Sequence, residues 1–224
     1  MVITGNLNDD QLLDKIYSAA AEYEKLLGKD FLIVGKNKKT DYFWFECCFE
    51  KKNFMHLLGI NSTTMSATEF FNRCSLYNRG EGAGLAIKDC TPSRDHKRRA
   101  VNEKSSCCAN LLRIQDARYM NIGKNEKIRQ YVDFSYAYGN EAVLGFERKT
   151  DKRSCFPITL IPSKIDDFTK HKYKIIFIFE KKLADERYGT ILMEIKKGIF
   201  PEHSQVFPQK LKQLIDIESE SQVI

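Results

Sequence analysis

The stretch that most restricts the fold of this chain is the aromatic run Tyr-Phe-Trp-Phe-Glu-Cys-Cys-Phe at residues 42–49. Its apolar side chains continue almost without interruption, which is typical of a β-strand buried on both faces. A charged break follows, and apolar residues resume at 54–60 around one histidine, His56. An imidazole held beside a rigid strand suits acid–base chemistry. The alternative is a core histidine that donates a hydrogen bond to a backbone carbonyl.

The composition indicates a globular protein of one large domain or two small ones, since the chain has 224 residues of which 42% are hydrophobic. No apolar run approaches the roughly 20 residues that span a bilayer, and the N-terminus lacks the pattern of a secretory signal. The seven cysteines do not have the spacing of a disulfide framework. We therefore expect a cytoplasmic protein without membrane segments.

Helices dominate the first half of the expected fold. Asn8 with Gln11 forms a capping box for a helix that ends before Gly28, and Ser66 with Glu69 forms another. Thr91-Pro92 is a typical helix start. The segments 31–34 and 42–49 are expected to form a hairpin.

Strands dominate the second half. We expect strands at 85–87, 131–138, 142–146, 154–161, 174–182 and 190–196, with a two-residue turn at Gly139-Asn140. Pro157 places its strand at an edge or at a bulge. The predicted fold class is α+β, with N-terminal helices packed on an antiparallel sheet of about four or five strands. Residues 1–197 are expected to form a single domain and residues 198–224 a C-terminal tail.

Two basic segments are candidates for contact with phosphate groups. The denser one lies at the start of the helix after Thr91, and the other lies at the hairpin tip. The members of the two segments are Arg94, Lys97, Arg98 and Arg99, and Lys38 and Lys39. The formal net charge of +6 permits a polyanionic partner without requiring one. The alternative for both segments is a solvated surface that keeps the protein soluble.

Metal chemistry finds little support in the sequence. Neither Cys-x-x-Cys nor His-Glu-x-x-His occurs, and the adjacent residues Cys47 and Cys48 point to opposite faces of a strand. Asp166 and Asp167 are more typical of a helix start than of a Mg²⁺ site. We therefore expect no metal and no cofactor. Histidine, hydroxyl and basic residues suffice for metal-independent RNA cleavage, in which the ribose 2′-OH attacks the phosphorus.

The run Phe54-Met55-His56-Leu57-Leu58-Gly59-Ile60 resembles the Phe-x-His-Leu-x-Gly-Ile signature of a phage-associated nuclease family. That family belongs to the broader group that unites barnase, EndoU, certain colicins and RelE-type toxins. Later segments follow in a similar order, so that the resemblance spans roughly residues 30–197. These later segments are 67–71, 85–88, 144–146, 157–160 and 181–182.

The resemblance implies a barnase- or RelE-like fold and an endoribonuclease that leaves a 2′,3′-cyclic phosphate. It makes His56 the general acid or base and matches Thr159 to a hydroxyl position on a strand. Charge and position alone add Arg148 and Lys181. RNA is then the substrate, and a toxin role with a cognate antitoxin or inhibitor protein follows from the same likeness.

Two other functions remain open from the sequence. The first is a non-catalytic module of a phage or mobile element that binds RNA or a host protein. Such a module would bury His56, whereas an enzyme needs this side chain exposed beside Arg or Lys. The second is a dimeric DNA-binding protein that uses the helix containing residues 94–99, although no helix-turn-helix spacing is evident. The sequence does not set the oligomeric state.

Overall fold

The computed structural model describes residues 7–93, 97–126, 134–148 and 154–216. Arg94 and the first part of the strand expected at 131–138 lie outside these residues. The helices are α1 (Asp9–Glu24), α2 (Lys51–Leu57), α3 (Ala67–Asn78), α4 (Arg98–Leu112), α5 (Phe200–Val206) and α6 (Gln209–Lys212). The strands are β1 (Lys29–Lys36), β2 (Tyr42–Cys48), β3 (Asn121–Lys124), β4 (Tyr136–Gly139), β5 (Val143–Arg148), β6 (Cys155–Ile161), β7 (Tyr173–Lys182) and β8 (Thr190–Glu194).

The N-terminal elements confirm the expected helix and hairpin. The Asn8 side chain accepts a hydrogen bond from the backbone N–H of Gln11, and the Gln11 side chain accepts one from the backbone of Asn8. These two bonds satisfy donors that the first turn of a helix leaves unpaired. β1 and β2 then pair as an antiparallel hairpin from Asp30 opposite Cys48 to Lys36 opposite Tyr42.

The sheet is larger than expected, since eight strands follow one another in the order β1-β2-β6-β5-β4-β3-β7-β8. The expected count of four or five is wrong because β3 is short and because the hairpin β1–β2 joins the later strands. β1 also pairs with β7, so the strands from β1 to β7 close into a ring and β8 extends beyond it. β2 and β6 run parallel and pair at a single position, Cys47 opposite Cys155.

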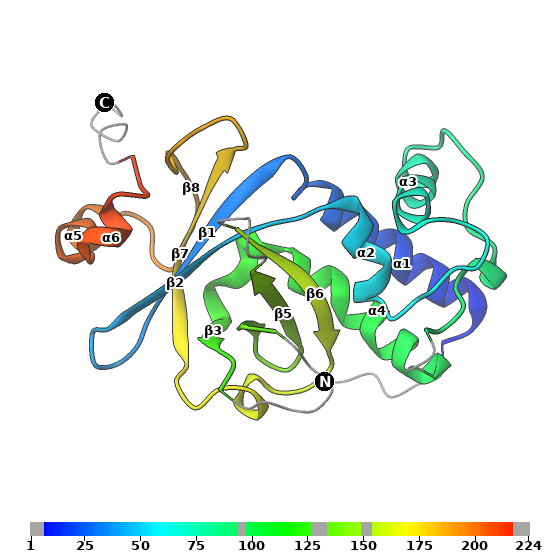
Figure 1. The fold of residues 1–224 in the computed structure, drawn as a ribbon, viewed down its shortest axis with the longest axis horizontal. Coiled ribbons are helices and arrows are strands. Elements are labelled where there is room, and N and C mark those ends of the chain that lie inside the picture. The colour runs from blue at the N-terminus through cyan, green and yellow to red at the C-terminus, as the bar shows by residue number, and fades with distance from the viewer. Residues whose placement is uncertain (1–6, 94–96, 127–133, 149–153, 217–224) are drawn as a thin grey trace.

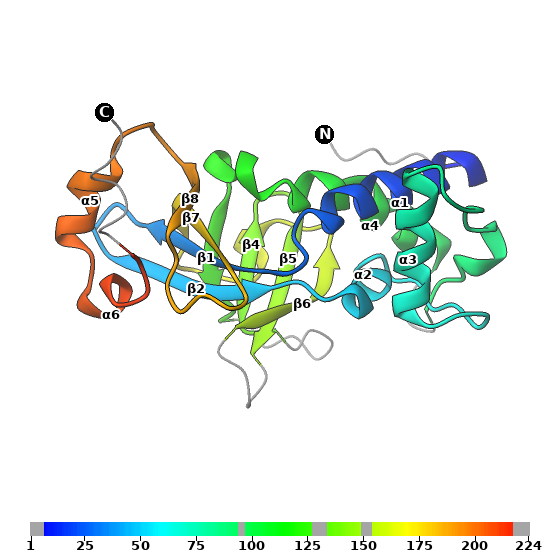
Figure 2. The same ribbon diagram turned by 90° about the horizontal axis from the view of Figure 1, so that it is seen from above.

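The helices cover this sheet from two sides. Figures 1 and 2 show α1–α4 gathered at one end of the molecule and α5 and α6 at the other end. The main core joins α1–α4 to one face of the strands, with buried residues such as Ile16, Phe45 and Phe71. A second core lies between α5–α6 and the opposite face of β1 and β7, where Phe177 and Phe200 are buried.

Local signals after residue 84 were partly misleading. The strand expected at 85–87 is wrong, because Ile87–Asp89 forms a 3-10 helix in which the Asp89 carboxylate accepts the backbone N–H of Ala86. The helix expected to start at Thr91-Pro92 begins at Arg98. The bulge at Pro157 is confirmed, since the register between β5 and β6 shifts next to Phe146, its partner.

β7 is central, as the sequence indicated, because it pairs with β1, β3 and β8. β4 and β5 form the expected hairpin, but the two-residue turn expected at Gly139-Asn140 is wrong: Gly139 still pairs with Val143, and residues 140–142 make the connection. Gly139 has φ of 131°, and a Cβ there would meet the carbonyl oxygen of Ala142 at 2.0 Å, so glycine is required. Within the described part of the chain, none of the helices combines the length and apolar character that a membrane crossing needs.

Candidate active site

Three strands bring acids and bases together on one face of the sheet. Asp30 of β1 lies directly opposite Cys48 of β2 and also opposite Lys181 of β7. Leu32, two residues further along β1, lies opposite Glu46. Residues directly opposite in a ladder share a face, and alternate residues of a strand return to it. Asp30, Glu46 and Lys181 therefore share the face that α5 and α6 partly cover.

Tyr188 connects the members of this cluster. Its hydroxyl donates a hydrogen bond to Oε2 of Glu46 at 3.1 Å, and its ring centroid lies 4.9 Å from Nζ of Lys181. Burial raises the pKa of Tyr188 above its ordinary value, so the hydroxyl keeps its proton and remains a donor. Tyr188 thus fixes the Glu46 carboxylate and stacks beneath the Lys181 ammonium group.

Asp30 is the second carboxylate of the cluster. Its Oδ2 lies 4.0 Å from Nζ of Lys181, and its Oδ1 accepts a hydrogen bond from Ser154 at 3.4 Å. Burial raises the pKa of Asp30, whereas Lys181, Ser154 and Cys48 oppose this rise. Lys181 also donates to the backbone carbonyl of Glu186 at 3.3 Å. The ammonium group of Lys181 is therefore held from several sides.

Two cavities open beside the cluster and have Lys29 in common. The larger, about 630 Å³, is lined by Lys29, Lys181, Lys182 and Arg187 together with four acidic residues. The smaller, about 350 Å³, is lined by Asp30, Ser154 and Glu50, among others. The pair formed by Asp30 and Lys181 lies where the two cavities adjoin. Both cavities are large enough to admit part of a polymeric substrate.

Arg148, the last residue of β5, lies close to the cluster but on the other face of the sheet. It is exposed, lies directly opposite Cys155 and forms a hydrogen bond with that thiol. Cys155 pairs with Cys47, whereas Glu46, the neighbour of Cys47 on β2, points to the opposite face. Of the four residues proposed as catalytic, Lys181 therefore belongs to the cluster, and Arg148 interacts with Glu46 only through its charge.

His56 lies on the last turn of α2, and its side chain is exposed. Lys52, one helical turn earlier, is exposed as well. Phe54 and Leu57 anchor α2 in the core, and the Asn53 side chain donates to the backbone carbonyl of Pro157 at 3.1 Å. The side chain of His56 is thus exposed to solvent beside Lys52, which is the environment that the enzyme hypothesis requires.

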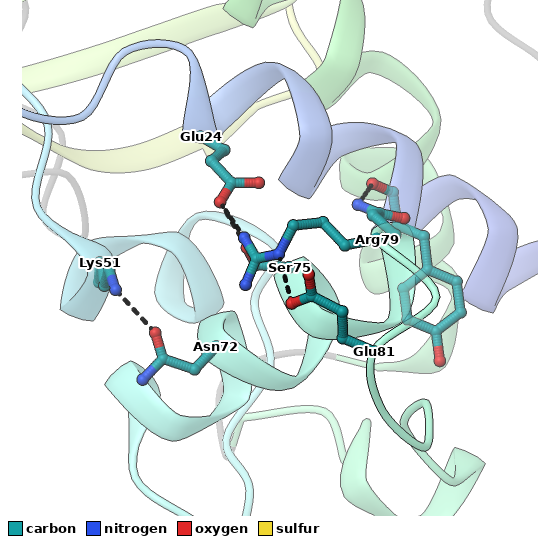
Figure 3. A network of polar contacts seen from close by, with 8 residues as sticks. Glu24, Lys51, Asn72, Ser75, Arg79 and Glu81 are labelled. Carbon is teal, nitrogen blue, oxygen red and sulfur yellow. Dashed lines mark hydrogen bonds and ion pairs between the residues drawn. The ribbon is translucent and has the colours of Figure 1, made fainter.

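A polar network on the neighbouring helices fixes α2 further (Figure 3). Lys51 of α2 donates to Asn72 of α3 at 2.9 Å. Arg79, at the end of α3, contacts Glu24 of α1 at 2.8 Å and Glu81 at 2.9 Å. The bond from Lys51 holds α2 to α3, and the ion pair of Arg79 with Glu24 holds α3 to α1. Both α1 and α3 carry buried core residues, so α2 is attached to the core of the molecule.

His56 and Thr159 lie apart from the cluster around Glu46. Along α2, His56 is six residues beyond Glu50, which lines the smaller cavity, and six residues of helix span about 9 Å. Thr159 is half-buried and lies opposite Gly145. Its methyl group and the ring of Phe134 fill the space where a Gly145 side chain would lie. That contact gives Thr159 a packing role.

The basic segments are separated from each other. Lys38 and Lys39 lie at the tip of the β1–β2 hairpin, whereas Lys97, Arg98 and Arg99 lie at the start of α4, at the opposite end of the molecule (Figure 1). Two of the cations at α4 are paired. Arg98 contacts Asp9 at 2.7 Å, and Arg99 contacts Glu103 at 2.9 Å. One continuous phosphate-binding surface that includes both segments is therefore not formed by the described residues.

The sequence did not single out Glu46, Asp30 or Tyr188. Glu46 is the one charged residue inside the aromatic run 42–49, and a charge in an otherwise apolar strand was the available signal. Asp30 and Tyr188 carried no local pattern. Groups of His, Cys, Asp and Glu with the geometry of a metal site are absent from the residues that the structure describes.

These observations define an α+β protein whose closed sheet gathers two carboxylates and a lysine on one face, beside cavities lined by further cations. A comparison with known families matches residues 15–197 to the family described as phage-Barnase-EndoU-ColicinE5/D-RelE like nuclease4. The chain belongs to this family, which confirms the resemblance and implies a nucleic acid substrate. Neither a curated protein nor a solved structure matches the chain significantly.

Proposed function

We propose that this protein is a metal-independent endoribonuclease that cleaves RNA through attack of the 2′-OH on the adjacent phosphorus. The observation that supports this proposal is the cluster in which Tyr188 holds the Glu46 carboxylate and contacts Lys181, with Arg148 within electrostatic reach of Glu46. A carboxylate and two cations supply a proton acceptor and charge stabilisation, the main requirements of such cleavage. The products are a 2′,3′-cyclic phosphate and a free 5′-OH.

In the proposed mechanism, Glu46 accepts the proton of the 2′-OH as the new P–O bond forms. Arg148 and Lys181 stabilise the negative charge that develops on the non-bridging oxygens of the pentacoordinate phosphorus. The bond to the 5′ oxygen then breaks, and that oxygen takes up a proton. DNA lacks the 2′-OH, so the chemistry selects RNA.

His56 is the proposed proton donor to the 5′ oxygen, reached by an RNA strand that continues from the cavities along α2. Its exposure and the neighbouring Lys52 support this role. Its separation from Glu46 argues for a smaller contribution, although contacts of this kind often shorten when substrate binds. We therefore expect a larger loss of rate from Glu46→Gln than from His56→Ala.

The test is cleavage of a mixed RNA pool by the purified chain in excess EDTA, with analysis of the product ends. Glu46→Gln and Lys181→Met should each reduce the rate at least about 100-fold. Lys15→Met is the control, because Lys15 is exposed on α1 and lines neither cavity. Cleavage that needs a divalent metal, or that is unaffected in Glu46→Gln, would refute the mechanism. Binding without cleavage would support the non-catalytic module.

The likeness of the family to RelE-type toxins and colicins also leads us to propose a toxin role with a cognate inhibitor protein. Expression of the wild-type chain should then arrest bacterial growth, and Glu46→Gln should not. Equal growth in both cultures, with both proteins present at equal levels, would remove the toxin role while leaving the nuclease proposal intact.

A further inference from the structure

The inner face of the ring carries a second constellation, at the mouth where β1, β3 and β5 end and β2, β4 and β7 begin. Lys124, the last residue of β3, lies directly opposite Tyr136, the first residue of β4. Tyr136 in turn lies opposite Phe146 of β5, and Arg148 follows two residues later on the same face. Lys124, Tyr136 and Arg148 therefore point to the same side of three consecutive strands.

A row of aromatic rings crosses the ring at this mouth. Tyr173 stacks on Phe43 with ring centroids 5.1 Å apart, and Tyr136 stacks on Phe45 with centroids 5.0 Å apart. Phe43 and Tyr136 are 6.0 Å apart, which joins the two stacks. β2 and β4 are not neighbours in the sheet, so these contacts are made across the interior of the ring.

The outer members of the row are accessible. Phe43, Tyr136 and Tyr173 are half-buried, while Phe45 beneath them is fully buried. Lys124 and Arg148, on either side of Tyr136 in the sheet, are exposed. We call Phe43, Tyr136, Tyr173, Lys124 and Arg148 the aromatic mouth. It presents partly exposed rings between two cations.

The aromatic mouth is held rigidly by its surroundings. Gly35 of β1 lies opposite Phe43, and a Cβ at Gly35 would come within 2.8 Å of Cβ of Tyr173 and 2.9 Å of Ile122. Glycine at this position thus allows Tyr173 to pack closely against β1. Rings that are fixed before binding lose little side-chain freedom when a ligand stacks on them.

We propose that the aromatic mouth binds unpaired bases of single-stranded RNA. The proposal rests on the nuclease function above and adds the form of its substrate. Aromatic rings offer stacking surfaces for bases of any identity, and flanking cations contact the phosphates between them. The charge of Glu46 acts on Arg148, so the aromatic mouth and the cluster around Glu46 lie within electrostatic reach of each other.

Single strands are favoured over duplexes by this arrangement. The bases of an A-form helix are stacked on one another, and only its backbone and grooves are open to side chains. Bases in loops, bulges and ends can leave the stack and reach the rings. We therefore expect cleavage in unpaired segments and little dependence on base identity from this site.

Binding of a fluorescein-labelled single strand of ten 2′-O-methyl nucleotides tests the proposal without cleavage, because the reactive hydroxyl is blocked. Fluorescence anisotropy with the full chain should show that Tyr136→Leu and Tyr173→Leu each weaken binding about tenfold. Tyr136→Phe and Tyr173→Phe, which keep the rings, should stay within about twofold of the wild type. Circular dichroism establishes that each variant is folded.

A second measurement on the wild type alone compares the same strand with its 2′-O-methyl duplex, which should bind at least about tenfold more weakly. Binding of folded leucine variants equal to that of the wild type, or equal binding of duplex and single strand, would overturn the aromatic mouth as a base-binding site. RNA cleavage that continues in those variants would show that the inference alone has failed. Binding that follows the expected pattern without any cleavage would show that the nuclease function alone has failed.

Discussion

Replacement of the buried Lys104 by methionine should stabilise this protein. Lys104 lies on α4 with only 5% of its surface exposed, on the helix face that also buries Val101 and Cys108. Burial lowers the pKa of Lys104 from 10.5 to about 8, and the neighbouring thiols of Cys107 and Cys108 oppose this change. Methionine has a similar length and no charge to desolvate.

The magnitude follows from the difference between the two pKa values. Between pH 8 and 10.5 the unfolded chain holds the Lys104 proton more tightly than the folded chain, so stability rises with pH across this range. Below pH 8 both states are protonated and the full cost of burying the charge is present. A pKa difference of about 2.5 corresponds to a cost of about 3 kcal/mol. Since the ammonium group also makes contacts, we expect Lys104→Met to raise the free energy of unfolding by about 1–3 kcal/mol at pH 7.

Urea unfolding followed through Trp44, the only tryptophan, measures this difference. The two proteins should be compared at each pH from 6 to 9.5, because buried tyrosines and cysteines affect both equally. The advantage of the variant should be constant below about pH 7 and shrink above pH 8. A variant that is less stable than the wild type at pH 7, or an advantage that does not change with pH, would refute the reasoning. Lys97→Met, an exposed change at the start of α4, should alter stability by less than about 0.5 kcal/mol.

Three further changes test other parts of the fold, each by urea or thermal unfolding. Asn8→Ala removes the cap of α1 and should cost about 1 kcal/mol, whereas no loss would mean that the capping box is not formed in solution. Gly35→Ala forces a methyl group against Tyr173 and should cost about 1–3 kcal/mol; an unchanged midpoint would contradict the close packing. Burial and the charge of Lys36 lower the pKa of His203 below its ordinary value of 6.5. The unfolded chain therefore binds this proton more readily than the folded chain, and the folded state loses stability as the pH falls through and below 6.5. Between pH 7 and 5 the wild type should therefore lose more stability than His203→Phe, and equal losses would exclude His203 as the cause.

Elements with strong local signals could be read from the sequence. The capping residues Asn8 and Ser66 determined where α1 and α3 begin, and the apolar runs of β2 and β7 had no other satisfactory environment than the interior of a sheet. The strand expected at 85–87 failed because Asp89 offers its carboxylate to the backbone, which favours a turn over an extended chain.

Features that depend on distant residues could not be read in this way. The closure of the ring depends on the pairing of β1 with β7. Neither strand has a local sequence pattern that indicates which strand it pairs with. The cluster around Glu46 likewise combines residues from β1, β2 and β7 with Tyr188. Arg148 and Lys181 were proposed from the sequence because each is a basic residue at the end of an apolar strand. Glu46 was not proposed from the sequence because the aromatic run around it was interpreted only as a buried strand.

The closed ring also dictates when the sheet can form during synthesis. β1 and β2 emerge early, but the second edge of β1 has to wait for residues 174–182 of β7. Contacts between residues so distant in the chain are slow to form, and an unpaired strand edge invites association with other chains. Because Lys181 is itself part of β7, the site around Glu46 is assembled only when the ring closes, so a chain that ends before β7 lacks the complete site.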